Sequence, residues 1–247
     1  MIRYRAKLKT SVTRLVNILF PELAALVPTL HKAYVYALLS EMPGAFHVAN
    51  CHLSHLKSLL HKTSKGRCDE TLAETLREAA RTSIGSIIPA KSLELKHTIR
   101  QIQDLTTDIE EIEESIDRIM DSIDSPITTI AGLKNRMGAM IIAEVGDFSN
   151  FDNADKILAY AGMSPSTYQS GQFNSGYCHM EKRGSRFLLF ALFNATKAVC
   201  RFDPEFRAYL AKKRAEGKHY YVALSHATKK LVRTIYRMEM TGEAYRR

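Results

Sequence analysis

A seam of nine large apolar residues constrains the fold of this chain more than any other feature. Successive members are three or four residues apart, close to a heptad repeat, with one extra step of three between Ile102 and Leu105. The spacing predicts one long helix in a coiled coil, formed with a second copy or with an antiparallel partner in the same chain. The alternative is an ordinary bundle helix. The seam consists of Leu95, Ile99, Ile102, Leu105, Ile109, Ile112, Ile116, Ile119 and Ile123.

Helical spacing also dominates on both sides of the seam, and no segment alternates apolar and polar residues convincingly. We therefore expect a mainly α fold with three parts: a helical N-terminal segment over residues 1–88, an acidic coiled coil over 89–125 and a compact helical C-terminal domain over 126–247. Proline and glycine mark the ends of the helices. The helices expected are 4–20, 29–41, 48–61 and 69–82 before the seam, and two short helices around Ala131–Gly132, then 151–161, 185–201, 204–216 and 219–240, after it.

The charge of the chain is unevenly distributed. The net charge is +9, but residues 104–124 hold nine acidic residues against the single Arg118, a net −8, which leaves +17 on the rest (9 + 8). Residues 181–247 hold sixteen Lys or Arg against six acids. Such surfaces attract nucleic acid through counterion release, although basic helices exposed to solvent are also common in proteins that bind none.

Two segments suggest contact with a phosphodiester. The Ala131–Gly132 turn resembles a helix-hairpin-helix, in which free backbone N–H groups hold a DNA phosphate; a purely structural glycine is the alternative. The polar loop over 167–177 places Ser170 beside Gly171, where a hydroxyl can approach a phosphate closely, and Lys182 and Arg183 follow it. Ser-Gly is also ordinary turn chemistry.

Metal, disulfide and membrane chemistry have weaker support in the sequence. If residues 48–61 form part of one continuous helix, His47, Cys51 and His55 share a face and could bind zinc, but such a row is more often a half-buried helix face. The spacing of the four cysteines fits neither a disulfide framework nor a zinc ribbon and favours free thiols. The longest apolar run is the seven residues 33–39. Together with the absence of a readable secretory signal, this predicts a cytoplasmic protein that does not enter the membrane.

From Ile127 to Tyr245 the chain resembles the C-terminal domain of the transposases of the IS-one-ten group of bacterial insertion sequences. The order and spacing of the matching elements cover about half of the chain, and the acidic seam occupies the position of the family's coiled coil. The elements are Ile130–Leu133, Ala143–Phe148, Phe151, Leu158–Pro165, Gln169–Gly171, Lys182–Ser185, Lys229–Leu231 and Tyr236.

The resemblance implies a DNA recombinase whose catalytic nucleophile is Ser170. Such proteins are understood to pair this serine with an N-terminal ribonuclease-H-like domain whose four carboxylates hold Mg²⁺, and some members use a structured guide RNA. None of those carboxylates maps onto this chain, so Mg²⁺ is expected only with a separate domain and no metal ligands are assigned here. Three positions depart from the family pattern: Ala131, Glu181 and Leu189. The DNA contacts implied are Gly132, Gly171, Lys182, Arg183, Arg186, Lys229 and Lys230.

The leading hypothesis is a truncated DNA-transposition protein that binds insertion-sequence ends and target DNA and forms a homo-oligomer. A second hypothesis is a non-catalytic DNA- or RNA-binding helical oligomer. A third is a structural helical protein that only assembles other chains. The second predicts nucleic-acid binding that does not change in Ser170→Ala, and the third predicts no such binding near physiological salt.

Overall fold

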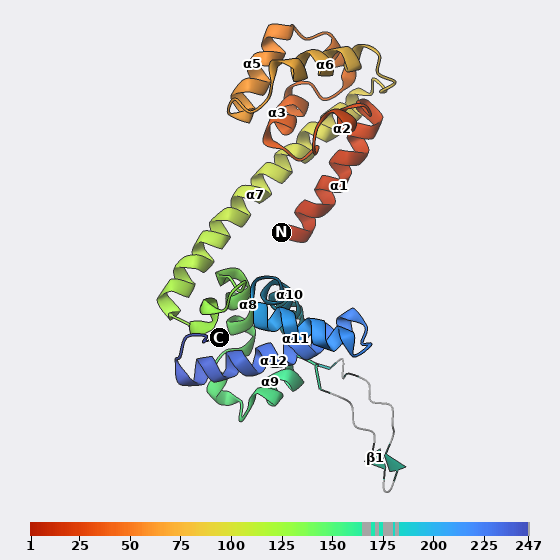
Figure 1. Ribbon diagram of the computed structural model, residues 1–247. Helices are drawn as coiled ribbons and strands as arrows, with labels where there is room; N and C mark the ends of the chain where they lie inside the picture. The colour runs from red at the N-terminus through yellow and green to blue at the C-terminus, as the bar shows by residue number, and fades with distance from the viewer. Residues whose placement is uncertain (165–168, 171–172, 175–179, 181–182, 247) are drawn as a thin grey trace. The chain divides into compact units, whose positions relative to one another are not determined.

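The protein is described here by a computed structural model covering residues 1–164, 169–170, 173–174, 180 and 183–246. The chain divides into two compact units, residues 1–112 and 113–247. Helices build both units (Figure 1), so the predicted mainly α fold class is confirmed. The predicted division into three parts stays a prediction. No helix within the described residues is long and apolar enough to cross a bilayer.

The apolar face of α1 forms part of the core of unit 1. Val12, Leu15, Val16 and Leu19 of this helix are all buried, as their spacing predicts. The helices of unit 1 are α1 (Ile2–Leu19), α2 (Leu23–Leu26), α3 (Ala33–Glu41), α4 (Ala45–Ala49), α5 (Leu53–Ser64), α6 (Glu70–Arg81) and the part of α7 (Pro89–Ile123) up to residue 112.

The predicted helix over 48–61 is wrong in its bounds, because the chain breaks between α4 and α5. Asn50 ends the first of these helices and donates a side-chain hydrogen bond from Nδ2 to the carbonyl of Phe46 (2.8 Å). His52 then adopts an extended conformation before α5 begins. A polar side chain that competes for the helix backbone explains the interruption.

The seam forms one continuous helix, α7, but its residues have different surroundings. Leu95, Ile99 and Ile102 are buried in the core of unit 1, so this part packs against helices of its own chain. Ile112, Ile119 and Ile123 remain 47%, 57% and 49% exposed. The bundle alternative therefore describes the first part of the seam, whereas the last part retains an uncovered stripe.

Unit 2 is organised around α10, which packs against α8, α11 and α12. Ser185 caps α10 by accepting a hydrogen bond from the backbone N–H of Leu188 (3.1 Å), and buried Asp203 caps α11 through the N–H of Phe206 (3.0 Å). Beyond the end of α7, the elements of unit 2 are η1 (Pro126–Thr129), α8 (Asn135–Val145), η2 (Phe148–Asn150), α9 (Ala154–Tyr160), β1 (Gln169–Ser170), β2 (Phe173–Asn174), α10 (Arg186–Phe202), α11 (Pro204–Ala215) and α12 (Tyr220–Thr241).

Candidate nucleic-acid interface

The segment that carries Ser170 is tied down where it leaves and rejoins the helices. The backbone N–H of Ser185 donates to the carbonyl of Tyr160 (2.8 Å), and the Ser185 hydroxyl donates to Glu144 (2.5 Å). Gly184 lies so close to this point that an added Cβ would be 2.5 Å from both the Gly162 nitrogen and the Tyr160 oxygen. The two ends of the segment are thus held together at the end of α9.

Ser170 itself lies in β1 (Figure 1). There it pairs with Phe173 of the antiparallel strand β2. The period-two analysis did not predict these strands, which are each two residues long. The structure describes the backbone of Ser170 and not its side chain, and Gly171 and Lys182 lie outside the described residues. The nucleophilic role of Ser170 stays a prediction.

The predicted helical hairpin is present, with Gly132 in the turn between η1 and α8. Its φ is +92°, and an added Cβ would lie 2.8 Å from the carbonyl oxygen of Ala198 in α10. Glycine is required here because the turn approaches another backbone closely and adopts a left-handed conformation. This supports the structural alternative for Gly132.

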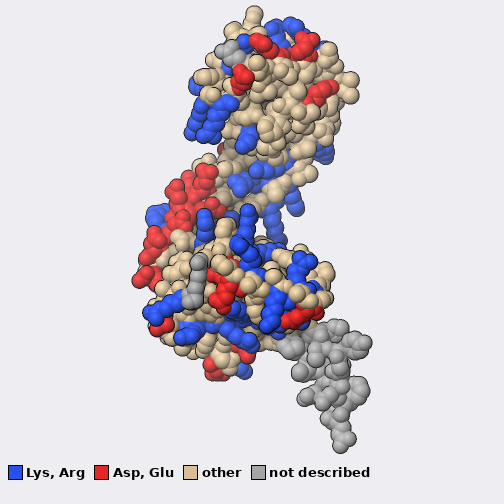
Figure 2. Space-filling view, viewed as in Figure 1, with Lys and Arg blue, Asp and Glu red and all other residues tan. Residues whose placement is uncertain are grey.

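The start of α8, which would supply the N–H groups of a hairpin phosphate site, faces carboxylates. Asn135 donates from Nδ2 to Asp117 (3.0 Å), and Arg136 pairs with Glu113 (3.2 Å). Figure 2 shows the acidic side chains gathered along the second half of α7. A phosphate would be repelled by these carboxylates. The DNA contact at Gly132 stays a prediction that its surroundings disfavour.

The other predicted basic residues fall into two places. Arg183 is exposed, and Arg186 opens α10 with its guanidinium carbon 5.1 Å from the centroid of the Phe187 ring. Lys229 and Lys230 lie on α12, where they line a groove of about 570 Å³, called here the α12 groove. Its walls come from α11, α12 and the residues after α12: Glu205, Tyr209, His226, Lys229, Lys230, Arg233, Thr234, Arg237, Met238, Thr241, Glu243, Ala244, Tyr245 and Arg246.

The cations of the α12 groove follow the exposed side of an amphipathic helix. Lys229, Lys230, Arg233 and Arg237 repeat at intervals of one, three and four residues, whereas Leu231, Val232 and Ile235 on the other side are buried. The chain then turns at Gly242, and the N–H of Tyr245 donates to the hydroxyl of Thr129 (2.9 Å). Arg233 and Arg237 were not predicted as DNA contacts, although their helical spacing from Lys229 and Lys230 can be read from the sequence.

The four cations are not equally available to a ligand. Lys230 pairs with Glu205 and lies 5.3 Å from the centroid of the Tyr209 ring, and Arg233 pairs with Asp155 (3.0 Å). No ion pair is recorded for Lys229 or Arg237 within the part of the chain that the structure describes. These two are the stronger candidates for a phosphate contact.

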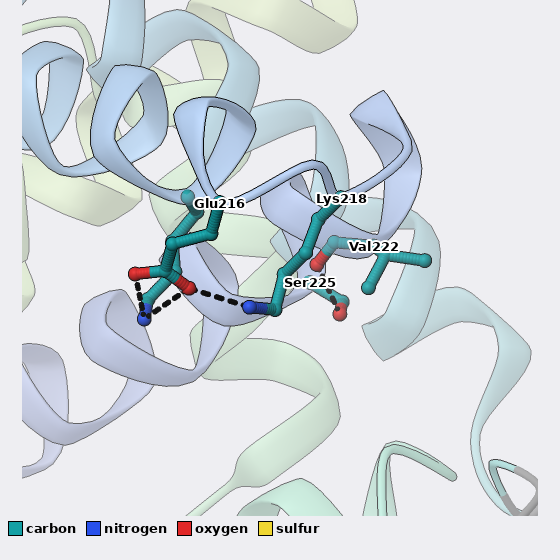
Figure 3. A network of polar contacts seen from close by, with 5 residues as sticks. Glu216, Lys218, Val222 and Ser225 are labelled. Carbon is teal, nitrogen blue, oxygen red and sulfur yellow. Dashed lines mark hydrogen bonds and ion pairs between the residues drawn. The ribbon is translucent and has the colours of Figure 1, made fainter.

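The pKa of His226, at the edge of the α12 groove, reflects its partial burial and the positive charges around it. Partial burial lowers the pKa of His226, and Lys213, Lys218 and Lys229 lower it further. Lys213 and Lys218 both bind Glu216 at the turn between α11 and α12 (Figure 3). Hydrogen bonds from Lys218 and then Lys213 lower the pKa of Glu216 to about 2. One carboxylate thus neutralises part of a strongly basic turn.

The histidine row proposed for a metal does not form one helix face. His47 belongs to α4 and His55 to α5, with Cys51 in the break between them. His55 instead contacts Glu41 through Nε2 (2.9 Å). Over the described ranges, no group of three or more His, Cys, Asp or Glu side chains is arranged to hold a metal ion.

Part of unit 2 is similar to a known protein family. Residues 124–211 match the family described as Transposase IS116/IS110/IS902. The chain is similar to the "Insertion element IS110 uncharacterized 43.6 kDa protein" of Streptomyces coelicolor, with 32% identity over 49% of this chain and 30% of that protein. It is also similar to the "Insertion element IS116 uncharacterized 44.8 kDa protein" of Streptomyces clavuligerus, with 26% identity over 96% of this chain and 62% of that protein.

A third relative is the "Insertion element IS900 uncharacterized 42 kDa protein" of Mycobacterium paratuberculosis, 29% identical over 70% of this chain and 45% of that protein. The chain thus spans from about a third to less than two thirds of the lengths of these relatives. The matched residues 124–211 include the Gly132 turn, the Ser170 strand pair and α10, so this part of the chain is similar to the transposase IS116/IS110/IS902 family.

Proposed function

We propose that this chain acts in the transposition of an insertion sequence, binding DNA and supplying Ser170 as the nucleophile for strand cleavage and rejoining. The observation that carries the proposal is the family match over residues 124–211, which includes Ser170. The similarity to three insertion-element proteins supports it. The positive charge of unit 2 supports DNA as the partner.

In this proposal the α12 groove holds the DNA backbone. Lys229 and Arg237 line it without a recorded ion pair in the described part of the chain, and their charges are directed at the same hollow. Duplex DNA releases counterions when phosphates are neutralised by Lys or Arg. Contacts of this kind position DNA without reading its sequence.

The binding test compares the full chain with the double variant Lys229→Gln/Arg237→Gln on a labelled insertion-sequence end. We expect the slope of log K against log salt concentration to become shallower by about 1.8, which is 0.9 for each lost phosphate contact. Lys156→Gln, an exposed lysine of α9, is the control and should leave the slope unchanged. Equal slopes for all three proteins would exclude the α12 groove as the DNA site.

The proposed chemistry is transfer of a DNA phosphoryl group to Ser170 and back. The Ser170 oxygen forms a bond to phosphorus as the bond between phosphorus and one strand end breaks, and the hydroxyl proton passes to the leaving oxygen. The covalent phosphoserine keeps the energy of the broken bond for rejoining. The described residues do not fit Mg²⁺, since they contain no suitable ligand cluster. In this proposal a separate carboxylate domain holds the ion.

Trapping of a covalent adduct tests the nucleophile. A mixture of the full chain, a carboxylate domain from a relative, Mg²⁺ and labelled end DNA should give a band that survives denaturant and is absent for Ser170→Ala. Thr167→Ala is the control, since it removes another hydroxyl from the same segment and should retain the band. An adduct that persists in Ser170→Ala would eliminate this residue. Salt-sensitive binding without any adduct would favour a non-catalytic DNA-binding protein.

The proposal also includes a second copy of the chain, a guide RNA and a location in the cytoplasm. The exposed isoleucines of α7 repeat with coiled-coil spacing and support self-association. A structured guide RNA would use phosphate contacts of the same kind, and its binding is tested by competition with the end DNA. Unpaired Cys51, Cys68 and Cys200 are in keeping with a reducing cytoplasm.

A further inference from the structure

A second surface of unit 2 combines exposed aromatic rings with cations and lies on α10. Phe187 and Phe190 are 55% and 48% exposed, and Tyr221 from the start of α12 is 57% exposed. Lys197 joins the two helices, because its ammonium lies 5.7 Å from the centroid of the Tyr221 ring. We call this surface the α10 aromatic face; it consists of Arg186, Phe187, Phe190, Lys197, Arg201 and Tyr221.

The rings of the α10 aromatic face are not needed for the core of unit 2. The opposite side of α10 is fully buried and supplies Leu188, Ala191, Leu192, Ala195 and Val199 to that core. Phe187, Phe190, Lys197 and Arg201 instead fall within an arc of about 80° around the helix, given 3.6 residues per turn. Large rings gathered on one exposed stripe indicate a binding surface rather than scattered exposure.

The charge of this surface selects a polyanion. The sequence of α10 contains no Asp or Glu, and its exposed cations are interleaved with the rings. The guanidinium carbon of Arg186 lies 5.1 Å from the Phe187 centroid. One carboxylate, Glu144, is near the start of α10, where it accepts a hydrogen bond from the hydroxyl of Ser185. This hydrogen bond occupies the Glu144 carboxylate.

We propose that the α10 aromatic face binds unpaired nucleotides of a DNA strand. The bases stack on Phe187, Phe190 and Tyr221, and the phosphates lie against Arg186, Lys197 and Arg201. Aromatic rings between cations are what single strands require, because every base offers a flat face for stacking. The stripe from Phe187 to Arg201 is about 21 Å long at 1.5 Å per residue. Known single-strand sites begin at about four nucleotides, so this length is sufficient.

The inference rests on the proposed function and adds a second DNA form to it. Cations line the α12 groove near Arg237, and the two tyrosines of its walls, Tyr209 and Tyr245, are half-buried, which suits the backbone of a duplex. The α10 aromatic face follows Ser170 in the chain by sixteen residues, at the start of α10. A strand that has been opened for cleavage by Ser170 exposes unpaired bases, and α10 gives them a surface to stack on.

The test measures fluorescence anisotropy of the full chain with a labelled 20-nucleotide oligothymidylate and, separately, with a 20-base-pair duplex. The variant Phe187→Leu/Phe190→Leu keeps apolar side chains but removes both rings. We expect its single-strand affinity to fall about tenfold or more, and its duplex affinity to change less than about twofold. Phe46→Leu, which removes an exposed ring of 53% exposure from unit 1, is the control and should leave both affinities unchanged.

The outcomes separate this inference from the proposed function. Retained single-strand binding in Phe187→Leu/Phe190→Leu, with duplex binding still sensitive to Lys229→Gln/Arg237→Gln, overturns the inference alone. Equal losses for the two DNA forms also overturn it. No binding of either form by the unmodified chain overturns both proposals. If the α10 aromatic face bound a protein instead, Phe187→Leu/Phe190→Leu would retain single-strand binding, and duplex binding would still be sensitive to Lys229→Gln/Arg237→Gln.

Photo-crosslinking gives a reading that does not depend on a substituted protein remaining folded. Oligothymidylate with 5-iododeoxyuridine at one position should crosslink to the peptide that contains Phe187 and Phe190, or to the peptide that contains Tyr221. An excess of unlabelled oligothymidylate should suppress the product. Crosslinks confined to other peptides would contradict the assignment.

Discussion

Gly184 shows how a single missing side chain positions the candidate nucleophile segment. Any larger residue would place a Cβ 2.5 Å from the backbone of Gly162 and Tyr160, and the φ of Gly184 is +155°. Neither contact is with a flexible side chain, so the backbone itself would have to move. Movement here would separate the two ends of the segment that carries Ser170.

We therefore expect Gly184→Ala to lower the free energy of unfolding by about 1–3 kcal/mol, as overpacking against fixed atoms does. Urea unfolding of the full chain measures this change. Gly217→Ala is the matched control, because Gly217 also has a positive φ (+78°) but nothing within 4 Å of an added Cβ. A loss in Gly184→Ala no larger than that in Gly217→Ala would show that the close approach contributes nothing.

We expect His226 to make the proposed DNA binding in the α12 groove sensitive to pH. Burial and neighbouring lysines lower its pKa in the free protein, so its own contribution to stability is present above the ordinary pKa and is lost as pH falls through the lowered value. A bound phosphate would raise that pKa again, and binding would then take up a proton. Affinity for duplex DNA should consequently rise as pH falls from 7.5 to 5.5.

His226→Gln should remove that rise, whereas His219→Gln, from the turn before α12, should keep it. Anisotropy titrations at fixed salt across this pH range give the comparison. Glu216, with a pKa of about 2, stays ionised throughout this range. An identical pH dependence in His226→Gln and the unmodified chain would place the DNA away from His226.

The basic residues of unit 2 show how far sequence reasoning reaches for single side chains. The sequence identified Lys229 and Lys230 as candidates, and both line the α12 groove. It could not show that Lys230 pairs with Glu205, 25 positions away, because that contact depends on how α11 packs against α12. Arg237 was within reach of a helical-spacing argument. What would have identified Arg237 is the helical spacing of the basic residues, not how many of them there are.

At the scale of elements, the spacing of apolar residues predicted where helices form better than it predicted which helices pack against one another. The seam gave the continuous helix α7, but burial of Leu95 and Ile99 depends on α1 and its neighbours, which spacing alone does not identify. The break at Asn50 was missed because the apolar spacing continues across it. β1 and β2 were missed because a two-residue strand has no period.

The uncovered stripe of α7 leads to a prediction about assembly. Ile119 and Ile123 are about half exposed and continue the heptad spacing of the buried seam. If a second copy covers them, Ile119→Gln/Ile123→Gln should shift light scattering at micromolar concentration from a dimer mass to a monomer mass. Ile84→Gln removes an isoleucine that is 86% exposed outside α7 and should leave the mass unchanged. A monomer mass for the unmodified chain would contradict self-association through α7.

At the scale of the whole molecule, the separation of charge should make the two proposed interactions, DNA binding and self-association, respond oppositely to salt. The proposed DNA binding by the basic surfaces should weaken as salt rises, because the release of each counterion into a more concentrated solution gains less entropy. Self-association of α7 should strengthen, because it brings together two copies of a segment with nine acids and one arginine, and salt screens their repulsion. We therefore expect low salt to favour the proposed DNA binding, and higher salt to favour the proposed self-association.

Neutralising two acids of α7 tests this opposition. Glu110→Gln/Glu114→Gln raises the net charge from +9 to +11 and removes repulsion at the helix, so self-association should occur at lower salt. Glu74→Gln/Glu78→Gln in α6 gives the same net charge and the same spacing on an exposed helix, and should leave the salt midpoint of assembly unchanged. Light scattering across a salt series at fixed protein concentration measures both. Equal midpoint shifts would mean that net charge alone controls assembly, and that the acids of α7 have no local role in it.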